Sequence, residues 1–207
     1  MLRKLHSALE PALHFPPAPP GLPAMHDPTP GSSGALPPSS SSAVRSLLVV
    51  YHSQTGATLQ MAQALVDGAR DAEPGLGVRL LHASAAHAGD VLAAQAYVFA
   101  TPENLGAISG LMKDFFDRTY YPALDQINGR ACALLVCAGS DGHNAARQMQ
   151  RIATGWRLKP VAEPLIVCTH AQTPEQILAP KQLDAPALQQ CRELGAALAT
   201  GLVMGIY

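Results

Sequence analysis

Residues 49–65 read VVYHSQTGATLQMAQAL, and this stretch decides the fold. It opens with an apolar run typical of a buried strand, continues through a short hydroxyl-rich loop around Gly56, and passes directly into a helical pattern of apolar residues. Main-chain N–H groups at the start of such a helix point outward, and the helix dipole adds positive potential there. The stretch therefore predicts a strand–loop–helix unit that binds a phosphate group.

The predicted phosphate loop has no cation of its own. No Lys or Arg lies between Arg45 and Arg70, so main-chain amides and hydroxyls would have to neutralise the anion. Gly56 lets the main chain approach the ligand closely. The alternative is an ordinary strand–turn–helix in which Ser53 or Thr58 caps the helix. The hydroxyl donors are Ser53, Thr55 and Thr58, and the preceding His52 is expected to be exposed.

Helical patterns alternate with apolar strands along the rest of the chain. This alternation predicts an α/β fold, a doubly wound five-stranded parallel sheet with helices on both faces in a three-layer sandwich. The third strand is expected to stop at Thr101-Pro102, because proline cannot continue a central ladder. Ser109 is expected to cap the next helix. The expected strands are 47–51, 78–82, 97–100, 131–138 and 165–169, with 159–161 as a candidate extension of the last.

The first 43 residues differ from the rest of the chain. They hold ten of the eighteen prolines and end in a Pro-Pro-Ser-Ser-Ser-Ser run. Such a segment buries too little apolar surface to offset its ordering entropy. The sequence therefore predicts a disordered Pro/Ser-rich tail over 1–43 and one domain over 44–207.

Composition excludes several classes of function. The net charge is −1 with 14% charged residues, and the basic residues are scattered, so nucleic acid is not an expected partner. No apolar run approaches the roughly 20 residues that span a bilayer, so membrane insertion is not expected. The four cysteines show no CxxC pattern or metal-ligand spacing, which favours a reducing, cytoplasmic location and no metal. The expected buried cysteines are Cys132, Cys137, Cys168 and Cys191.

The opening stretch resembles the first signature of the flavodoxin family. The residues in register with it are Val49, Val50, Tyr51, Ser53, Gly56, Thr58, Ala62 and Leu65. The resemblance implies the flavodoxin-like strand order 2-1-3-4-5 and FMN as cofactor. It makes the candidate phosphate shell Ser53, Gln54, Thr55, Gly56, Ala57 and Thr58.

A second stretch, residues 99–118, reads FATPENLGAISGLMKDFFDR and resembles the second signature of the same superfamily. There a Thr-Pro is followed by a small-residue loop, a Ser-Gly and a helix ending in Phe-x-Asp-Arg. Ordinary loop polarity is the alternative for Glu103 and Asn104. The resemblance places under the polar edge and face of the flavin Pro102, Glu103, Asn104, Leu105, Gly106 and Ala107.

The loop after the fourth strand gives a weaker match. In an open parallel sheet, ligands bind where the strand order reverses, here between the first and third strands with this loop beside them. His143 is a candidate for stacking on the ring or binding substrate, and a solvated helix-start residue is the alternative. No catalytic residue is assigned, because the flavin carries the chemistry. The candidate contacts in this loop are Gly139, Ser140, Gly142 and His143.

Two absences distinguish the chain from electron-carrier flavodoxins. No Trp or Tyr lies in residues 101–109 or 139–143, and the domain is not acidic. The chain thus more closely resembles NAD(P)H-dependent FMN and quinone reductases. That resemblance implies an FMN oxidoreductase that takes electrons from NAD(P)H and passes them to a quinone or other small-molecule acceptor, in a homodimer or tetramer. The alternatives are an electron carrier without a substrate of its own and a non-catalytic module. Residues 138–142 come one residue short of a hydrolase nucleophile elbow, but a triad needs a carboxylate and then a histidine after the serine, and only His143 and His170 follow it.

Overall fold

The computed structural model describes residues 45–207, and the predicted tail lies outside these described residues. A parallel sheet forms the middle layer, with strand order β2-β1-β3-β5-β6. The predicted order 2-1-3-4-5 is confirmed, because β5 is the fourth expected strand. The long strands are β1 (Ser46–Tyr51), β2 (Gly77–His82), β3 (Ala96–Asn104) and β5 (Ala131–Ala138).

The last position of the sheet is filled by two short strands. β6 (Lys159–Pro160) pairs with the start of β5, and β7 (Leu165–Cys168) pairs with its end, both in parallel. Pro164 lies between them and has no N–H to donate to a ladder. The fifth strand and its candidate extension are therefore separate segments along one edge.

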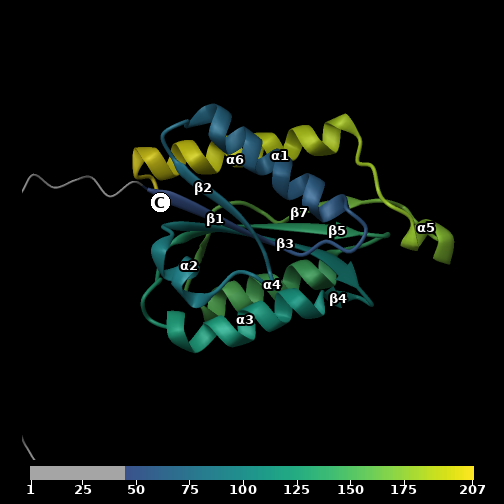
Figure 1. Ribbon diagram of the computed structural model, residues 1–207, viewed down its shortest axis with the longest axis horizontal. Helices are drawn as coiled ribbons and strands as arrows, with labels where there is room; N and C mark the ends of the chain where they lie inside the picture. Colours follow the sequence, from purple (N-terminus) through teal and green to yellow (C-terminus); the bar gives the residue numbers. More distant parts are fainter. Residues whose placement is uncertain (1–44) are drawn as a thin grey trace, which may run out of the picture. The chain divides into compact units, whose positions relative to one another are not determined.

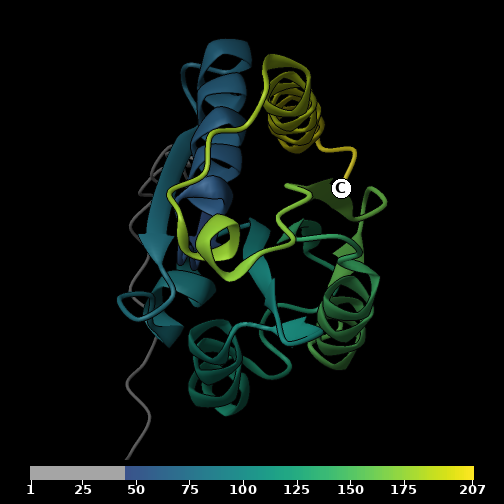
Figure 2. The same ribbon diagram turned by 90° about the vertical axis from the view of Figure 1, so that its right-hand side faces the viewer.

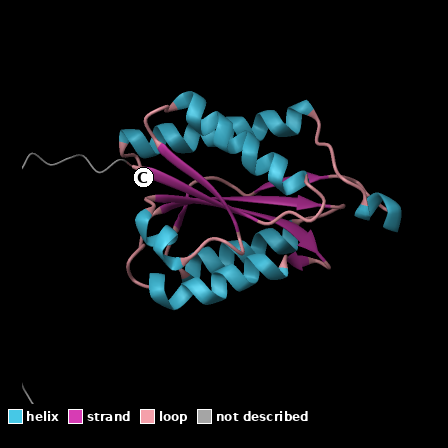
Figure 3. Cartoon of the chain, in the orientation of Figure 1, coloured by secondary structure: helices cyan, strands magenta, loops and turns pink. Residues whose placement is uncertain are grey.

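Helices cover both faces of the sheet, as Figures 1 and 3 show. α1 (Ala57–Ala72) and α6 (Ala185–Met204) lie on one face. α2 (Ala88–Ala93), α3 (Gly110–Ala123) and α4 (His143–Gly155) lie on the other. No helix within residues 45–207 has the length and apolar character needed to cross a bilayer.

Alternation along the strands builds the two cores. In β1, Leu47 and Val49 pack toward α1 and α6, whereas Leu48 and Val50 pack toward the opposite helices. Side chains of a strand alternate between faces, so a continuous apolar run is what a sheet covered on both faces requires. The core between the sheet and α2, α3 and α4 is centred on four aromatic residues whose ring centroids lie 5.0–6.1 Å apart: Phe99, Phe115, Phe116 and Trp156.

The expectation that β3 ends at Thr101-Pro102 is wrong. β3 continues to Asn104, and Pro102 stands opposite Cys137 of β5. On its other side β1 has already ended, since its last contact is the His52 N–H donating to the Ala100 carbonyl at 3.0 Å. Main-chain polar groups two residues apart in a strand point to the same side, so the missing N–H of Pro102 would face the β1 side, as the Ala100 carbonyl does. No strand lies there to accept a hydrogen bond, so the proline is tolerated.

Glycines let α1 and α6 approach each other closely. A Cβ at Gly195 of α6 would stand 2.0 Å from the Leu65 carbonyl oxygen. Reciprocally, a Cβ at Gly68 of α1 would stand 2.1 Å from the Arg192 carbonyl oxygen. The first and last helices are thus in main-chain contact, a packing that any larger side chain would prevent.

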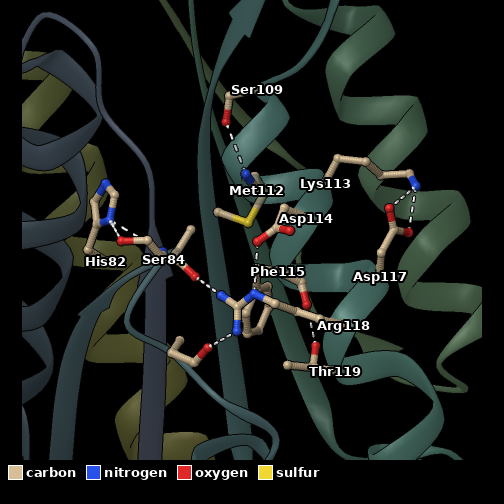
Figure 4. Close-up of polar contacts among 12 residues, drawn as sticks. His82, Ser84, Ser109, Met112, Lys113, Asp114, Phe115, Asp117, Arg118 and Thr119 are labelled. Carbon is tan, nitrogen blue, oxygen red and sulfur yellow. Dashed lines mark hydrogen bonds and ion pairs between the residues drawn. The ribbon is translucent and has the colours of Figure 1, made fainter.

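Arg118 attaches α3 to the segment between β2 and α2, as Figure 4 shows. Its guanidinium donates to the carbonyls of Ala83 and Ala86, the latter at 2.7 Å, and pairs with Asp114 at 2.8 Å. Arg118, the last residue of the second signature, therefore has a structural role in these contacts.

Candidate functional site

A cleft opens at the carboxyl ends of the strands, where the loops after β1 and β3 diverge. This is the point at which the strand order reverses, and it is where ligands bind in open parallel sheets. Figure 2 looks onto this end of the sheet. The lining residues are Ser53, Gln54, Thr55, Ala57, Thr58, Pro102, Glu103, Asn104, Cys137, Ala138, Gly139, Thr169, Ala171, Ile177, Leu178 and Lys181.

The first wall is the predicted phosphate loop. Gly56 is the N-cap of α1 and has φ 94°, a left-handed conformation that glycine adopts without strain. Its N–H donates to Ser53 Oγ at 3.1 Å. Because a hydroxyl that accepts a bond keeps its own proton, Ser53 can still donate to a ligand. Neither Ser53 nor Thr58 caps α1 through its side chain, so the simple capping alternative is wrong.

The first turn of α1 offers donors toward the cleft. The Gln60 N–H is the first to be used within the helix, bonding to the Gly56 carbonyl at 3.1 Å. Helix geometry leaves the N–H groups of residues 57–59 without an acceptor inside the helix. The first turn carries no acidic side chain that would compete for the same donors. A phosphate monoester fits this donor set.

The second wall is the loop of residues 101–109, which is closed at its base by two buried hydroxyls. The Thr101 hydroxyl bonds to Ser109 Oγ, and the Ser109 N–H donates to Thr101 Oγ1, each at 3.1 Å. Ser109 also accepts from the Met112 N–H at 3.4 Å, which confirms it as the cap of α3 (Figure 4). The Thr and Ser of the second signature therefore fix both ends of the loop.

Within this loop, β3 and β4 (Ala107–Ile108) form a tight hairpin. Leu105 and Gly106 at its tip both have positive φ, 51° and 71°. Leu105 is fully exposed, and neither tip residue nor Ala107 lines the cleft. The predicted contacts Pro102, Glu103 and Asn104 do line it, whereas Leu105, Gly106 and Ala107 remain outside in this structure.

The third wall is the loop of residues 139–142 between β5 and α4, and Glu103 joins the second wall to it. Its carboxylate accepts from the Gly142 N–H at 2.9 Å and from the Ala145 N–H at 3.4 Å, at the start of α4. Gly139 lines the cleft beside it. The three other predicted contacts of this loop lie outside the lining: Ser140, Gly142 and the exposed His143.

The fourth wall was missed by the sequence analysis. Residues 169–184, the C-terminal strap, run from β7 to α6 across the carboxyl end of the sheet and include α5 (Pro174–Leu178) (Figure 2). Ile177, Leu178 and Lys181 of the strap line the cleft. Lys181, a basic residue far from the phosphate loop in sequence, thus lines the same cleft as that loop. A capping box, Thr173 with Gln176, was the available sequence signal for α5.

Burial shifts the pKa of two side chains at the carboxyl ends of the strands, His52 and Cys137. His52 is half-buried rather than exposed, and its Nδ1 is the one buried side-chain nitrogen or oxygen within residues 45–207 that has no hydrogen-bond partner. Desolvation, together with the neighbouring His82, lowers its pKa. Burial raises the pKa of Cys137 to about 11, so its thiol is neutral in the cleft wall. Cys168, expected to be buried, is only half-buried.

The sheet order and the helices on both faces define an α/β protein with a flavodoxin-like fold. Residues 82–173 match the family described as NADPH-dependent FMN reductase. A flavodoxin of Aquifex aeolicus (strain VF5) is 39% identical over 99 residues, which are 47% of this chain and 53% of that protein. The chain thus spans about half the length of this relative. The fold of this chain is flavodoxin-like, with a parallel sheet between two layers of helices.

Solved structures agree with this fold. A flavodoxin from the domain Archaea superposes with a TM-score of 0.62 at 17% identity, covering 76% of this chain and 99% of that one. A flavodoxin, WrbA-like protein from Agrobacterium tumefaciens gives a TM-score of 0.61 at 20% identity, covering 77% and 98%. At this identity the likeness establishes the fold alone.

Proposed function

We propose that this protein binds FMN in the cleft and acts as an NAD(P)H-dependent oxidoreductase that reduces a quinone or another small acceptor. The observation that carries the proposal is the donor set at the start of α1, open to a cleft at the point where the strand order reverses. The family match over residues 82–173 supports the same cofactor and the same class of reaction.

Different walls of the cleft would bind different parts of FMN. Ser53 and the N–H groups of the first turn of α1 would hold the phosphate. Pro102, Glu103 and Asn104 would border the ring system on one side, and Ala138 and Gly139 on another. FMN, when bound, supplies the capacity to accept and release one or two electrons. The protein holds the cofactor and shapes its surroundings.

A reductase needs one face of the flavin ring to be open to its substrates, whereas an electron carrier does not. None of the described residues that line the cleft is aromatic, so no aromatic side chain there would stack on the flavin ring. A nicotinamide or a quinone could occupy that face. In the overall reaction NAD(P)H gives up a hydride to become NAD(P)⁺, and a quinone takes up the two electrons and the proton of that hydride together with one proton from solvent to become a hydroquinone.

The test uses the full chain loaded with FMN. We expect a yellow protein that loses its colour anaerobically on addition of NADH or NADPH and regains it when a quinone is added. A chain that binds no FMN at saturating supply would refute the proposal altogether. A yellow protein that neither nicotinamide can reduce would refute the reductase part alone.

The second candidate is a flavodoxin-type electron carrier, which the 39% identity to an Aquifex flavodoxin favours. A carrier would bind FMN equally well and exchange electrons with a protein partner. Dithionite would reduce it, whereas NADH and NADPH would leave it oxidised. Parallel reduction by dithionite and by each nicotinamide therefore separates the two candidates.

A further inference from the structure

The C-terminal strap is fastened to the phosphate loop at Lys181. The Lys181 N–H donates to the Thr55 carbonyl at 2.8 Å. The Gln60 side chain of α1 completes the attachment, because its Nε2 donates to the Lys181 carbonyl at 2.7 Å and its Oε1 accepts from the Leu183 N–H at 3.1 Å. The main chain of Lys181 is therefore fixed against the loop that is proposed to hold the phosphate.

The ammonium group of Lys181 is also fixed. It donates to the carbonyls of Gln176, Ile177 and Ala179, the last two at 3.0 and 2.7 Å. These carbonyls belong to the end of α5, where a cation satisfies main-chain acceptors that the helix itself leaves open. A flexible side chain is thereby held in one place at the edge of the cleft.

This charge is not cancelled nearby. Lys181 is in no ion pair with a carboxylate of residues 45–207. Among the described residues of the lining, Lys181 is the one basic residue and Glu103 the one acidic residue. The Glu103 carboxylate is already bound by two N–H groups of α4. Burial raises the pKa of the Cys137 thiol in the cleft lining to about 11, and the positive charge of Lys181 acts on that pKa in the opposite direction.

We propose that Lys181 is the cation that neutralises the phosphate of the bound mononucleotide, and that it makes the site prefer FMN to riboflavin. This inference rests on the proposed function. A phosphate monoester carries a charge of about −1.5 to −2 at neutral pH. The Ser53 hydroxyl, the N–H groups of residues 57–59 and one fixed ammonium would share that charge, and the ammonium acts through space without leaving its carbonyls.

The test compares FMN with riboflavin, which lacks the phosphate. Kd values are measured by flavin fluorescence quenching for the full-length wild type and for Lys181→Met, which keeps the length of the side chain and removes its charge. We expect the Kd for FMN to rise about 10- to 100-fold, as for loss of a charged partner. The Kd for riboflavin should change less than about twofold, and Lys181→Arg should bind FMN like the wild type.

The controls separate charge from structure. Lys159→Met removes an exposed lysine of β6, at the amino end of the sheet, and should leave both Kd values unchanged. The FMN Kd of the wild type should rise with salt more steeply than that of Lys181→Met. Equal weakening of FMN and riboflavin in Lys181→Met would reduce Lys181 to a support of the strap and overturn the inference. Unchanged FMN binding in that variant would also overturn it, while leaving the proposed function intact. A wild type that binds neither flavin would overturn both.

Discussion

The carboxylate of Glu103 accepts a hydrogen bond from the main-chain N–H of Gly142 at 2.9 Å. One residue of the β3 loop thus caps the start of α4 and holds two walls of the cleft together. The resemblance had placed Glu103 under the polar edge and face of the flavin, with ordinary loop polarity as the alternative. In the structure the charge is used by the protein itself, at a helix start where a negative charge is favourable.

Replacing Glu103 with Ala should lower the free energy of unfolding by about 1–2 kcal/mol, because α4 loses its cap and a dipole interaction. Glu103→Gln keeps one acceptor oxygen and should cost less. Urea denaturation measures both values. Glu163→Ala removes an exposed glutamate and serves as the control, with an expected change within about 0.5 kcal/mol. Equal stability of Glu103→Ala and Glu163→Ala would contradict the capping role.

His52 should make stability depend on pH. Burial lowers its pKa in the folded state below the unfolded value of 6.5. Below pH 6.5 the unfolded chain therefore takes up the proton first, so stability is greatest above this pH and falls as the solution becomes more acidic. His52→Asn has no titrating group and should show a smaller loss of Tm between about pH 7.5 and about pH 5. A variant whose Tm falls as steeply as that of the wild type would show that His52 is not responsible.

The contact between α1 and α6 should tolerate no side chain at Gly195. Its Cβ would stand 2.0 Å from the main-chain oxygen of Leu65, so the helices must separate. Gly195→Ala should lower the free energy of unfolding by about 1–3 kcal/mol. Gly75→Ala is the matched control, because nothing lies within 4 Å of a Cβ there. Chemical denaturation that gave the same midpoint for both variants would rule out the close approach of the helices.

At the tip of the β3–β4 hairpin, a substitution should raise the stability of the protein rather than lower it. Leu105 has φ 51° and is fully exposed, so its side chain contributes little and its main chain is strained. Asparagine adopts this conformation more readily and is common at the first position of such two-residue turns. Leu105→Asn should raise the free energy of unfolding by about 0.5–1 kcal/mol, seen as a higher Tm. The same change at Leu111, an exposed residue in α3, should not stabilise; a Tm gain there but not at Leu105 would refute the strain argument.

The sheet could be predicted from the sequence because its signals are local. Apolar runs such as residues 131–138 are continuous, and the parallel order follows from the helices between them. The strand–loop–helix unit of β1 and α1 was predicted for the same reason, since its three parts are contiguous in the chain. The end of β3 was not predicted correctly, because proline interrupts a strand only where a neighbouring strand needs its N–H, and β1 has already ended beside Pro102.

The rest of the site depends on contacts that no local pattern encodes. Lys181 lies more than a hundred residues from the loop it adjoins, and its approach is fixed by Gln60, a residue that reads as an ordinary helix surface position. Glu103 was found by its place in a motif, but its partner in α4 follows from packing. The hairpin tip was placed at the flavin by resemblance alone, and in the structure Leu105 is exposed and does not line the cleft.

The main-chain contact between α1 and α6 also sets the order of events during synthesis. α1 ends at Ala72 and its partner begins at Ala185, so about 110 residues must be translated after α1 emerges before that partner exists. At about 5–20 residues per second, one apolar flank of α1 waits roughly 6 to 20 seconds on the ribosome. Early-acting chaperones that shield exposed apolar helices would therefore meet this chain at α1.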